Sequence, residues 1–127
     1  MQERKETGND ARKFCIDDAQ DWMGWAGFSL ADVLTDDENP QAQLGAIGFT
    51  RARRGANSNF RFSNDEVLVV TRGSCSIHIR DTVLHAEPGQ VVYLPAGTTG
   101  TIRADEDCDL VYVASSLRME ATTAAAA

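Results

Sequence analysis

Apolar and polar positions alternate with a period of two through most of the second half of the chain. From Gly45 onward, short β-branched segments are separated by Gly, Pro, Asn or Asp, which is typical of strands joined by tight turns. These segments cover residues 46–53, 60–72, 75–80, 82–89, 90–97, 99–104 and 109–115. Short strands that recur about every eight to ten residues predict an all-β sandwich or barrel.

The flanking parts of the chain are less regular. Residues 14–22 begin extended and lead into an acid-rich turn, while residues 25–40 carry an apolar stretch that ends at a strong Asn-Pro breaker. Residues 1–13 and the alanine-rich tail, 117–127, are expected to be disordered. The 127-residue chain is therefore predicted to form one domain over residues 14–116.

Charge and composition exclude several classes of function. The net charge of −7 argues against nucleic acid as the main partner, because phosphate binding needs a basic face. No apolar run approaches the roughly 20 residues that span a bilayer, and MQERKETGND lacks the apolar stretch of a signal peptide. A cytoplasmic protein without a membrane partner is expected.

The sequence also lacks the common cofactor and nucleophile motifs. Neither GxxxxGK[ST] nor GxGxxG is present, so a nucleotide-dependent enzyme of the usual kinds is not expected. The three cysteines are odd in number and far apart, which predicts free thiols rather than a disulfide framework or a CxxC metal site. No Ser-His-Asp or Cys-His arrangement can be recognised from spacing. We expect no cofactor.

Two glycine-containing motifs stand at a characteristic separation. Glu66 is followed by Gly73 in E-x6-G, and PGQVVYLPAG contains Gly89, Pro95 and Gly97 in G-x5-P-x-G, sixteen residues after Gly73. This pair resembles the two-motif core of the cupins.

Within the cupins, the chain most resembles the cupin domain of the ethanolamine-utilisation protein Q (EutQ) family. The segments that carry this resemblance are SLADVLTDDE, FSNDEVLVVTRG, HAEPGQVVYLPAG and LVYVAS, within residues 14–116. The resemblance implies a single cupin (double-stranded β-helix, or jelly-roll) barrel with a short N-terminal segment. It also implies an internal pocket for a small-molecule substrate and, commonly, a homodimer.

The metal-binding positions of the cupin motifs are altered. The two histidine positions of the first motif fall on Phe60 and Phe62, and the last falls on Gly100, which leaves Glu66 alone. A single carboxylate cannot hold a transition ion that requires three or four ligands, so a metal-free site is predicted. A metal site with unusual ligands, built from Glu66, His78 and His85, remains the alternative.

Glu66 is the leading catalytic candidate. Alternation places it on one face with Phe60 and Phe62, and the cupin resemblance implies that this face lines the barrel interior. A carboxylate beside two aromatic rings is poorly solvated, which raises its pKa and suits it to general acid–base catalysis near neutral pH. The alternative is a structural hydrogen bond or ion pair.

Arginine and tyrosine side chains are candidates to hold an oxyanion. Arg51 and Arg53 share a face with two apolar residues in AIGFTRAR, and an inward guanidinium would bind a carboxylate or enolate bidentately. The alternative is an edge strand kept soluble by charge. Tyr93 and Tyr112 each carry a hydroxyl that would donate to a bound oxygen, or they pack within a half-buried sheet.

The remaining candidates are His78 and Trp25. His78 lies on the face of SIHIR opposite the apolar residues, and it is either a surface histidine or, if it points into the pocket, an acid–base partner for Glu66. Trp25 and Trp22 precede the barrel strands, where they cover a barrel end, form a dimer seam or close over the pocket.

The sequence thus predicts a metal-independent, non-redox enzyme of the isomerase, cyclase or lyase type. The catalytic residues would be Glu66, Arg51 and Tyr93. The substrate-binding residues would be Phe60, Phe62, Arg53, His78, Tyr112 and Trp25. The alternative from another class is a non-catalytic small-molecule-binding cupin.

Overall fold

Ten strands and one short 3₁₀ helix make up the computed structural model, which describes residues 11–35, 37 and 44–115. Of the residues predicted to be disordered, 1–13 and 117–127, all but 11–13 lie outside the described part. The elements are η1 (Ile16–Asp18), β1 (Met23–Trp25), β2 (Phe28–Thr35), β3 (Leu44–Ala52), β4 (Asn57–Arg61), β5 (Glu66–Arg72), β6 (Cys75–Ile79), β7 (Thr82–Ala86), β8 (Val91–Leu94), β9 (Thr99–Ala104) and β10 (Cys108–Ser115).

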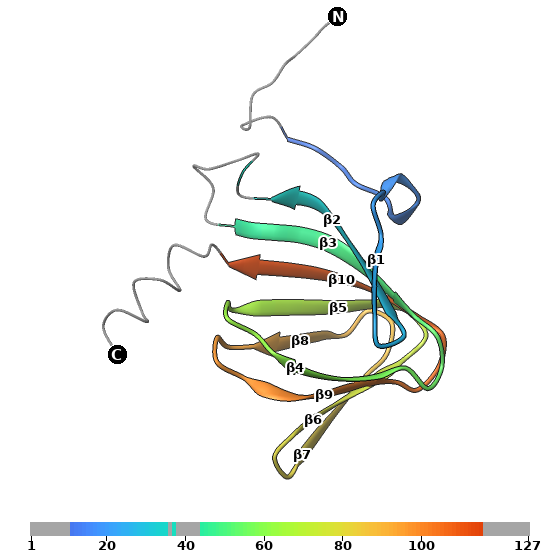
Figure 1. Cartoon of the computed structure of the whole chain (residues 1–127), viewed down its shortest axis with the longest axis vertical. Coiled ribbons are helices and arrows are strands. Elements are labelled where there is room, and N and C mark those ends of the chain that lie inside the picture. The colour runs from blue at the N-terminus through green and yellow to red at the C-terminus, as the bar shows by residue number, and fades with distance from the viewer. Residues whose placement is uncertain (1–10, 36, 38–43, 116–127) are drawn as a thin grey trace, which may run out of the picture.

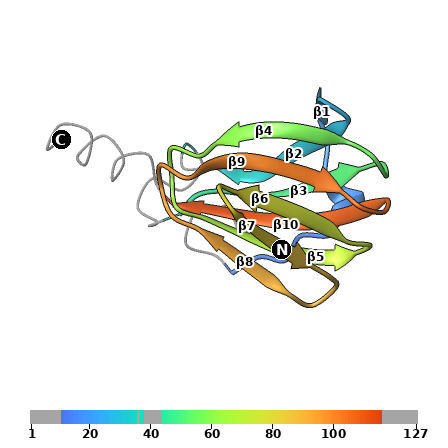
Figure 2. The same ribbon diagram turned by 90° about the horizontal axis from the view of Figure 1, so that it is seen from below.

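The strands form two antiparallel sheets that face each other (Figures 1 and 2). One sheet has six strands in the order β1-β2-β3-β10-β5-β8, and the other has four in the order β4-β9-β6-β7. The predicted all-β jelly-roll is confirmed. Among the described residues the two sheets do not hydrogen-bond to each other, so the predicted barrel is not closed.

One predicted strand is divided between the two sheets. The sequence pattern predicts one extended segment over residues 60–72, but β4 ends at Arg61 in the four-stranded sheet and β5 begins at Glu66 in the six-stranded sheet. The connection is fastened by backbone hydrogen bonds from Phe62 to Thr98, 3.1 Å, and from Gly97 to Phe62, 2.8 Å. The chain therefore crosses from one layer to the other just before the candidate catalytic carboxylate.

Buried apolar side chains from both sheets pack in part of the space between them. The largest that are fully buried come from β5, β6, β8 and β10: Ile77, Leu94, Leu110, Val70, Cys75 and Cys108. All three cysteines are free, as predicted. No helix in the described part of the chain is long and apolar enough to cross a membrane.

Gly73 accounts for the spacing of the first motif in physical terms. It turns the chain from β5 to β6 with a φ of +72°, in the left-handed region that glycine adopts without strain. A Cβ at this position would lie 2.0 Å from the carbonyl oxygen of Asp107. The turn therefore requires glycine both for its backbone angle and for its close approach to the chain before β10.

Candidate functional site

A cavity of about 470 Å³ lies between the two sheets. Its size is within the range of about 300–1,000 Å³ that is usual for small-molecule sites. Its described walls come from β1, β2, β3, β4, β5, β9 and β10 and from adjoining turns: Trp25, Phe28, Leu30, Asp32, Thr35, Asp37, Gly45, Ala46, Thr50, Ser58, Phe60, Phe62, Asn64, Glu66, Leu68, Ile102, Leu110, Tyr112, Ala114 and Ser115.

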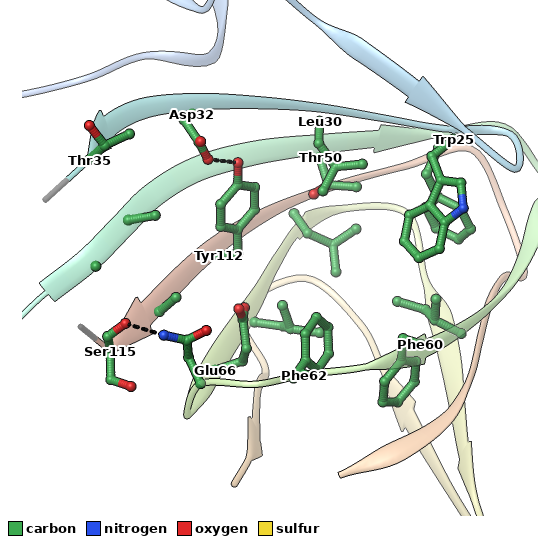
Figure 3. A pocket seen from close by; sticks show the side chains of 18 of the residues that line it. Trp25, Leu30, Asp32, Thr35, Thr50, Phe60, Phe62, Glu66, Tyr112 and Ser115 are labelled. Atoms are coloured by element: carbon green, nitrogen blue, oxygen red, sulfur yellow. Dashed lines mark hydrogen bonds between the residues drawn. The ribbon is translucent and has the colours of Figure 1, made fainter. Parts of the chain in front are cut away.

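The cavity has a polar end and an aromatic end (Figure 3). Asp32, Glu66 and Tyr112 lie together toward one end, while Trp25 and Phe60 lie toward the other, with Phe62 between them. Such a site presents charged groups to one part of a ligand and apolar surface to the rest.

Glu66 is positioned by the connection that precedes it. Asp65 accepts a hydrogen bond from the Ala96 amide, 2.8 Å, and its own amide donates to the Ser115 hydroxyl, 3.1 Å. The Asn64 amide group also donates to the carbonyl of Ser115, 2.8 Å. These bonds tie the start of β5 to the end of β10 and to the turn after β8, so that the Glu66 side chain points into the cavity.

The environment of Glu66 changes its ionisation. Partial burial, and secondarily the nearby charge of Asp32, raise the pKa of Glu66 from 4.5 to about 7. This is the direction expected for a carboxylate among aromatic and aliphatic side chains. At neutral pH both the protonated and the ionised forms are populated, which suits a group that accepts a proton and returns it.

Tyr112 and Asp32 form a hydrogen-bonded pair across three strands. The Tyr112 hydroxyl donates to Asp32 Oδ1, although β3 lies between their strands. The phenol can cross β3 because the β3 residue paired with both Tyr112 and Asp32 is Gly48. A Cβ at this position would lie 2.1 Å from the Tyr112 hydroxyl oxygen. Burial and this hydrogen bond raise the pKa of Tyr112, so the phenol stays protonated.

The aromatic end is formed by a stacked pair of rings. The centroids of Phe60 and Phe62 are 4.8 Å apart, with an angle of 26° between the ring planes. Gly100 faces Phe60 across β4 and β9, and a Cβ there would lie 3.1 Å from the ring and 2.3 Å from the His78 carbonyl oxygen. Glycine at this position therefore gives the phenylalanine ring the room that it occupies.

Five of the predicted site residues meet at the cavity. Glu66, Phe60, Phe62 and Tyr112 line it as expected, and Trp25 stands at its edge with 55% of its surface exposed. The first three face the cavity together although Phe60 and Glu66 belong to different sheets and Phe62 to the connection between them, because the two sheets face each other.

The expectation that Arg51 and Arg53 face inward is wrong. Within β3, Thr50 and Ala52 are buried on the face that Thr50 turns to the cavity, while Arg51 is exposed on the other face; Arg53, which directly follows β3, is exposed as well. Arg51 binds Asp109, 3.3 Å, and its guanidinium lies 5.7 Å from the centre of the Trp22 ring. Its partners are thus on the outside of the six-stranded sheet, because the small residues rather than the bulky ones of β3 face the cavity.

Tyr93 and His78 also point away from the cavity. On β8, Val92 and Leu94 are buried, which leaves Tyr93 on the outer face with 59% of its surface exposed. On β6, Cys75 and Ile77 are buried and His78 is exposed. Their predicted contact with substrate is not supported, because strand alternation turns both side chains outward.

The most important residue that the sequence reasoning missed is Asp32. It stands in SLADVLT among apolar residues, as Glu66 does in its own segment, and the same reasoning would have selected it. A shift of register between Asp32 and Leu34 obscures the alternation of β2. Hydroxyl and amide groups at Thr50, Ser58 and Asn64 were also missed.

The described residues do not fit a metal ion. They contain no group of three or more His, Cys, Asp or Glu side chains that could bind one. The cupin ligand positions carry Phe60, Phe62 and Gly100 beside Glu66, and the first two are packed as rings. His85 lies outside the cavity and contacts Asp105 and Glu87, so the unusual ligand set with Glu66 is not brought together.

Two facing antiparallel sheets with an internal cavity are the arrangement of a cupin jelly-roll. Residues 52–127 match the family of AraC-like ligand binding domains, and the chain belongs to that family. The resemblance to cupins is thus confirmed. A search of curated protein sequences gave no match.

Solved structures support the same fold. A protein of unknown function from Rhizobium leguminosarum bv. viciae 3841 is 28% identical, with a TM-score of 0.71 over 84% of this chain and 98% of that one. The EutQ protein of Clostridium difficile is 20% identical, with a TM-score of 0.62 over 69% and 61%. Ectoine synthase from P. lautus is 17% identical, with a TM-score of 0.67 over 79% and 72%.

Proposed function

We propose that the protein binds an organic small molecule in the cavity and catalyses a non-redox proton transfer on it. The reaction would be of the isomerase, cyclase or lyase type. Glu66 would act as the proton carrier, without a metal ion. The observation that carries this proposal is a carboxyl group that points into a largely apolar cavity with a pKa of about 7.

The ionisation of Glu66 suits catalysis in both directions. A general base is most effective when its pKa lies near the working pH, because the ionised form is then abundant and its conjugate acid still gives up the proton. Glu66 would remove a proton from the bound molecule and return it to a different atom, so that the enzyme ends in its starting state. Tyr112 stays protonated and donates to Asp32, which fixes the carboxylate whose charge acts on Glu66.

The charges around the cavity limit the reaction. No arginine, lysine or histidine is among its described lining residues. Of the two arginines that were candidates for stabilising an oxyanion, Arg51 lies on the outer face of β3, and Arg53, which directly follows this strand, is exposed. The site therefore favours a transition state that is neutral or positively charged at the reacting centre over one that develops an uncompensated negative charge.

Deuterium incorporation tests this proposal on a mixture of candidate substrates. The wild-type protein would be incubated with a metabolite extract of the source cells in D₂O, and the extract analysed by high-resolution mass spectrometry. We expect one compound to be converted or to gain deuterium. We expect Glu66→Gln to slow this by about 10²–10⁴-fold, the usual contribution of a general acid–base residue.

The matched control is Asp81→Asn, which removes one negative charge at the β6–β7 turn, outside the cavity. It should behave as the wild type does. Undiminished conversion by Glu66→Gln would remove Glu66 from the mechanism.

A second candidate function is supported by the family itself. Its description is ligand binding, which requires no chemistry, and the cavity meets the geometric needs of a binding module. In the same experiment, a compound that is retained by the protein but neither converted nor labelled would favour this function. If the protein only binds this compound, Glu66→Gln should change its affinity, and neither the wild type nor any variant should convert it.

A further inference from the structure

The charged groups that line the cavity are all acidic. Asp32, Asp37 and Glu66 supply three carboxyl groups, and no basic side chain is among the described lining residues. Asp32 receives a hydrogen bond from Tyr112, but among the described residues neither Asp32 nor Glu66 forms an ion pair with a basic side chain. A ligand with a positive charge would supply the missing countercharge.

Two arginines on the strands of the cavity wall point away from the cavity. Arg51 and Arg72 both bind Asp109 on the outer face of the six-stranded sheet, at 3.3 Å and 3.1 Å. Basic groups are thus available on the strands that form the cavity wall, but strand alternation directs them away from it. The three carboxyl groups that line the cavity form no ion pair with a basic side chain of the described residues.

The rest of the cavity suits the body of an organic cation. The stacked rings of Phe60 and Phe62 and the indole of Trp25 present aromatic surface in the part of the cavity away from Asp32, with Phe62 on the side of Glu66. Aromatic faces attract cations as well as apolar groups. An inorganic cation would instead need three or more converging ligands, and the described residues provide no such group.

We propose that the ligand of the cavity is a small organic ammonium ion with an apolar body, its charge held between Glu66 and Asp32 and its body against the phenylalanine pair. This inference rests on the proposed small-molecule function and names its ligand class. It excludes carboxylates and phosphates as the group bound at the polar end, because they would face like charges.

The number of protons released or taken up on binding distinguishes a cationic ligand from an anionic one. The titratable groups that line the cavity with Glu66 are Asp32, Asp37 and Tyr112, while β4 and β9 contribute Phe60 and Ile102, which do not ionise. An ammonium ion would favour the ionised carboxylate and lower the pKa of Glu66, so that binding releases a proton. An anionic ligand would have the opposite effect and take up a proton.

Probes of matched size and different charge test the inference. Phenethylamine, phenethyl alcohol and phenylacetate have similar bodies and carry a positive, zero and negative charge, and benzyltrimethylammonium carries a positive charge that no pH change removes. Binding of each would be measured by isothermal titration calorimetry from about pH 6 to about pH 8, in two buffers that differ in ionisation enthalpy. The difference between the buffers reports proton release.

We expect the two cations to bind at least about tenfold more tightly than the alcohol or the acid at pH 8. The affinity for benzyltrimethylammonium should rise up to about tenfold from pH 6 to pH 8, because the ionised fraction of Glu66 rises from about a tenth to about nine tenths. Glu66→Gln should remove this pH dependence, and Asp81→Asn should preserve it. At pH 7 about half a proton should be released for each cation bound.

The outcomes separate the inference from the proposed function. Equal or tighter binding of phenethyl alcohol or phenylacetate would overturn the ammonium assignment and leave the cavity as a small-molecule site. Cation binding that is unchanged in Glu66→Gln would overturn the assigned position of the charge. Failure of all four probes to bind would overturn the proposed ligand class, while conversion of a different compound in the D₂O experiment would still support catalysis.

Discussion

Glu66 should make the stability of the folded protein depend on pH in a way that Glu66→Gln abolishes. In the folded state its pKa is about 7, against 4.5 for a freely solvated glutamate. The folded protein therefore binds this proton more tightly than the unfolded chain does. The associated stability is fully present below about pH 4.5 and is lost as the pH rises through about 7.

The size of the effect follows from the same two values. At about 1.36 kcal/mol for each pH unit, a pKa raised from 4.5 to about 7 corresponds to about 3 kcal/mol. Glutamine resembles the protonated acid and does not titrate. The free energy of unfolding of Glu66→Gln, relative to that of the wild type, should thus increase by about 3 kcal/mol between about pH 4.5 and about pH 8.

Urea unfolding followed by tryptophan fluorescence at several pH values measures this difference. Other carboxyl groups titrate in both proteins, so subtraction removes most of their contribution. Asp81→Asn, at an exposed turn, should give a profile parallel to that of the wild type. If the profile of Glu66→Gln were also parallel, the side chain would be solvated and the reasoning on its burial would be refuted.

Three further predictions concern the glycine beside Tyr112, the ion pairs of Asp109 and the exposure of the cysteines. Gly48→Ala should lower the free energy of unfolding by about 1–3 kcal/mol, since its Cβ would overlap the phenol that crosses β3. Arg51→Gln and Arg72→Gln should each have a small effect on thermal stability, but the double variant should lose more than their sum, because either arginine alone still pairs with the buried Asp109. A thiol reagent should modify only Cys15 in the folded protein and all three cysteines in guanidinium chloride.

Each of these predictions has a result that would contradict it. Unchanged urea unfolding of Gly48→Ala would show that the phenol moves freely and does not hold Asp32. Additive effects of the two arginine substitutions would show that Asp109 is stable without a basic partner. Rapid modification of the buried thiols would contradict their burial, which raises the pKa of Cys75 to about 11 and that of Cys108 to about 12.

The fold could be predicted from the sequence because its signals are local. Alternation and turn residues marked the later strands, and the E-x6-G and G-x5-P-x-G motifs marked the cupin architecture. Gly73 shows why such a motif can be recognised: its backbone angle and its contact with Asp107 tolerate no side chain. The layer change between β4 and β5 was missed, because two short apolar segments separated by a polar turn look like one interrupted strand.

The interior of the site was predicted where bulky apolar residues surround an acid, and it was mispredicted where they do not. Phe60, Phe62 and Glu66 follow the rule that large apolar side chains face inward. On β3 the rule fails, because the cavity needs space and the inward positions include Gly48 and Thr50. Positions that line a cavity can carry small side chains that leave space for a ligand, and the hydrophobicity of the sequence alone does not identify such positions.

Contacts between distant strands were beyond the reach of sequence patterns. The pair formed by Asp32 and Tyr112 joins residues eighty positions apart, through a gap that exists only because the strand between them carries glycine. Tyr93 and Tyr112 occupy similar apolar segments, VVYLP and LVYVA, and only the register of their strands decides which one reaches the cavity.

The ionisation of Glu66 in the folded protein is measured most directly by ¹³C NMR of its labelled side-chain carboxyl carbon. The resonance would be assigned as the one missing from Glu66→Gln, and titrated with and without benzyltrimethylammonium. We predict a midpoint at about pH 7 in the free protein, shifted to lower pH by the cation. A midpoint near 4.5 in the free protein, unaffected by the cation, would contradict the role of Glu66 as proton carrier and as ammonium ligand.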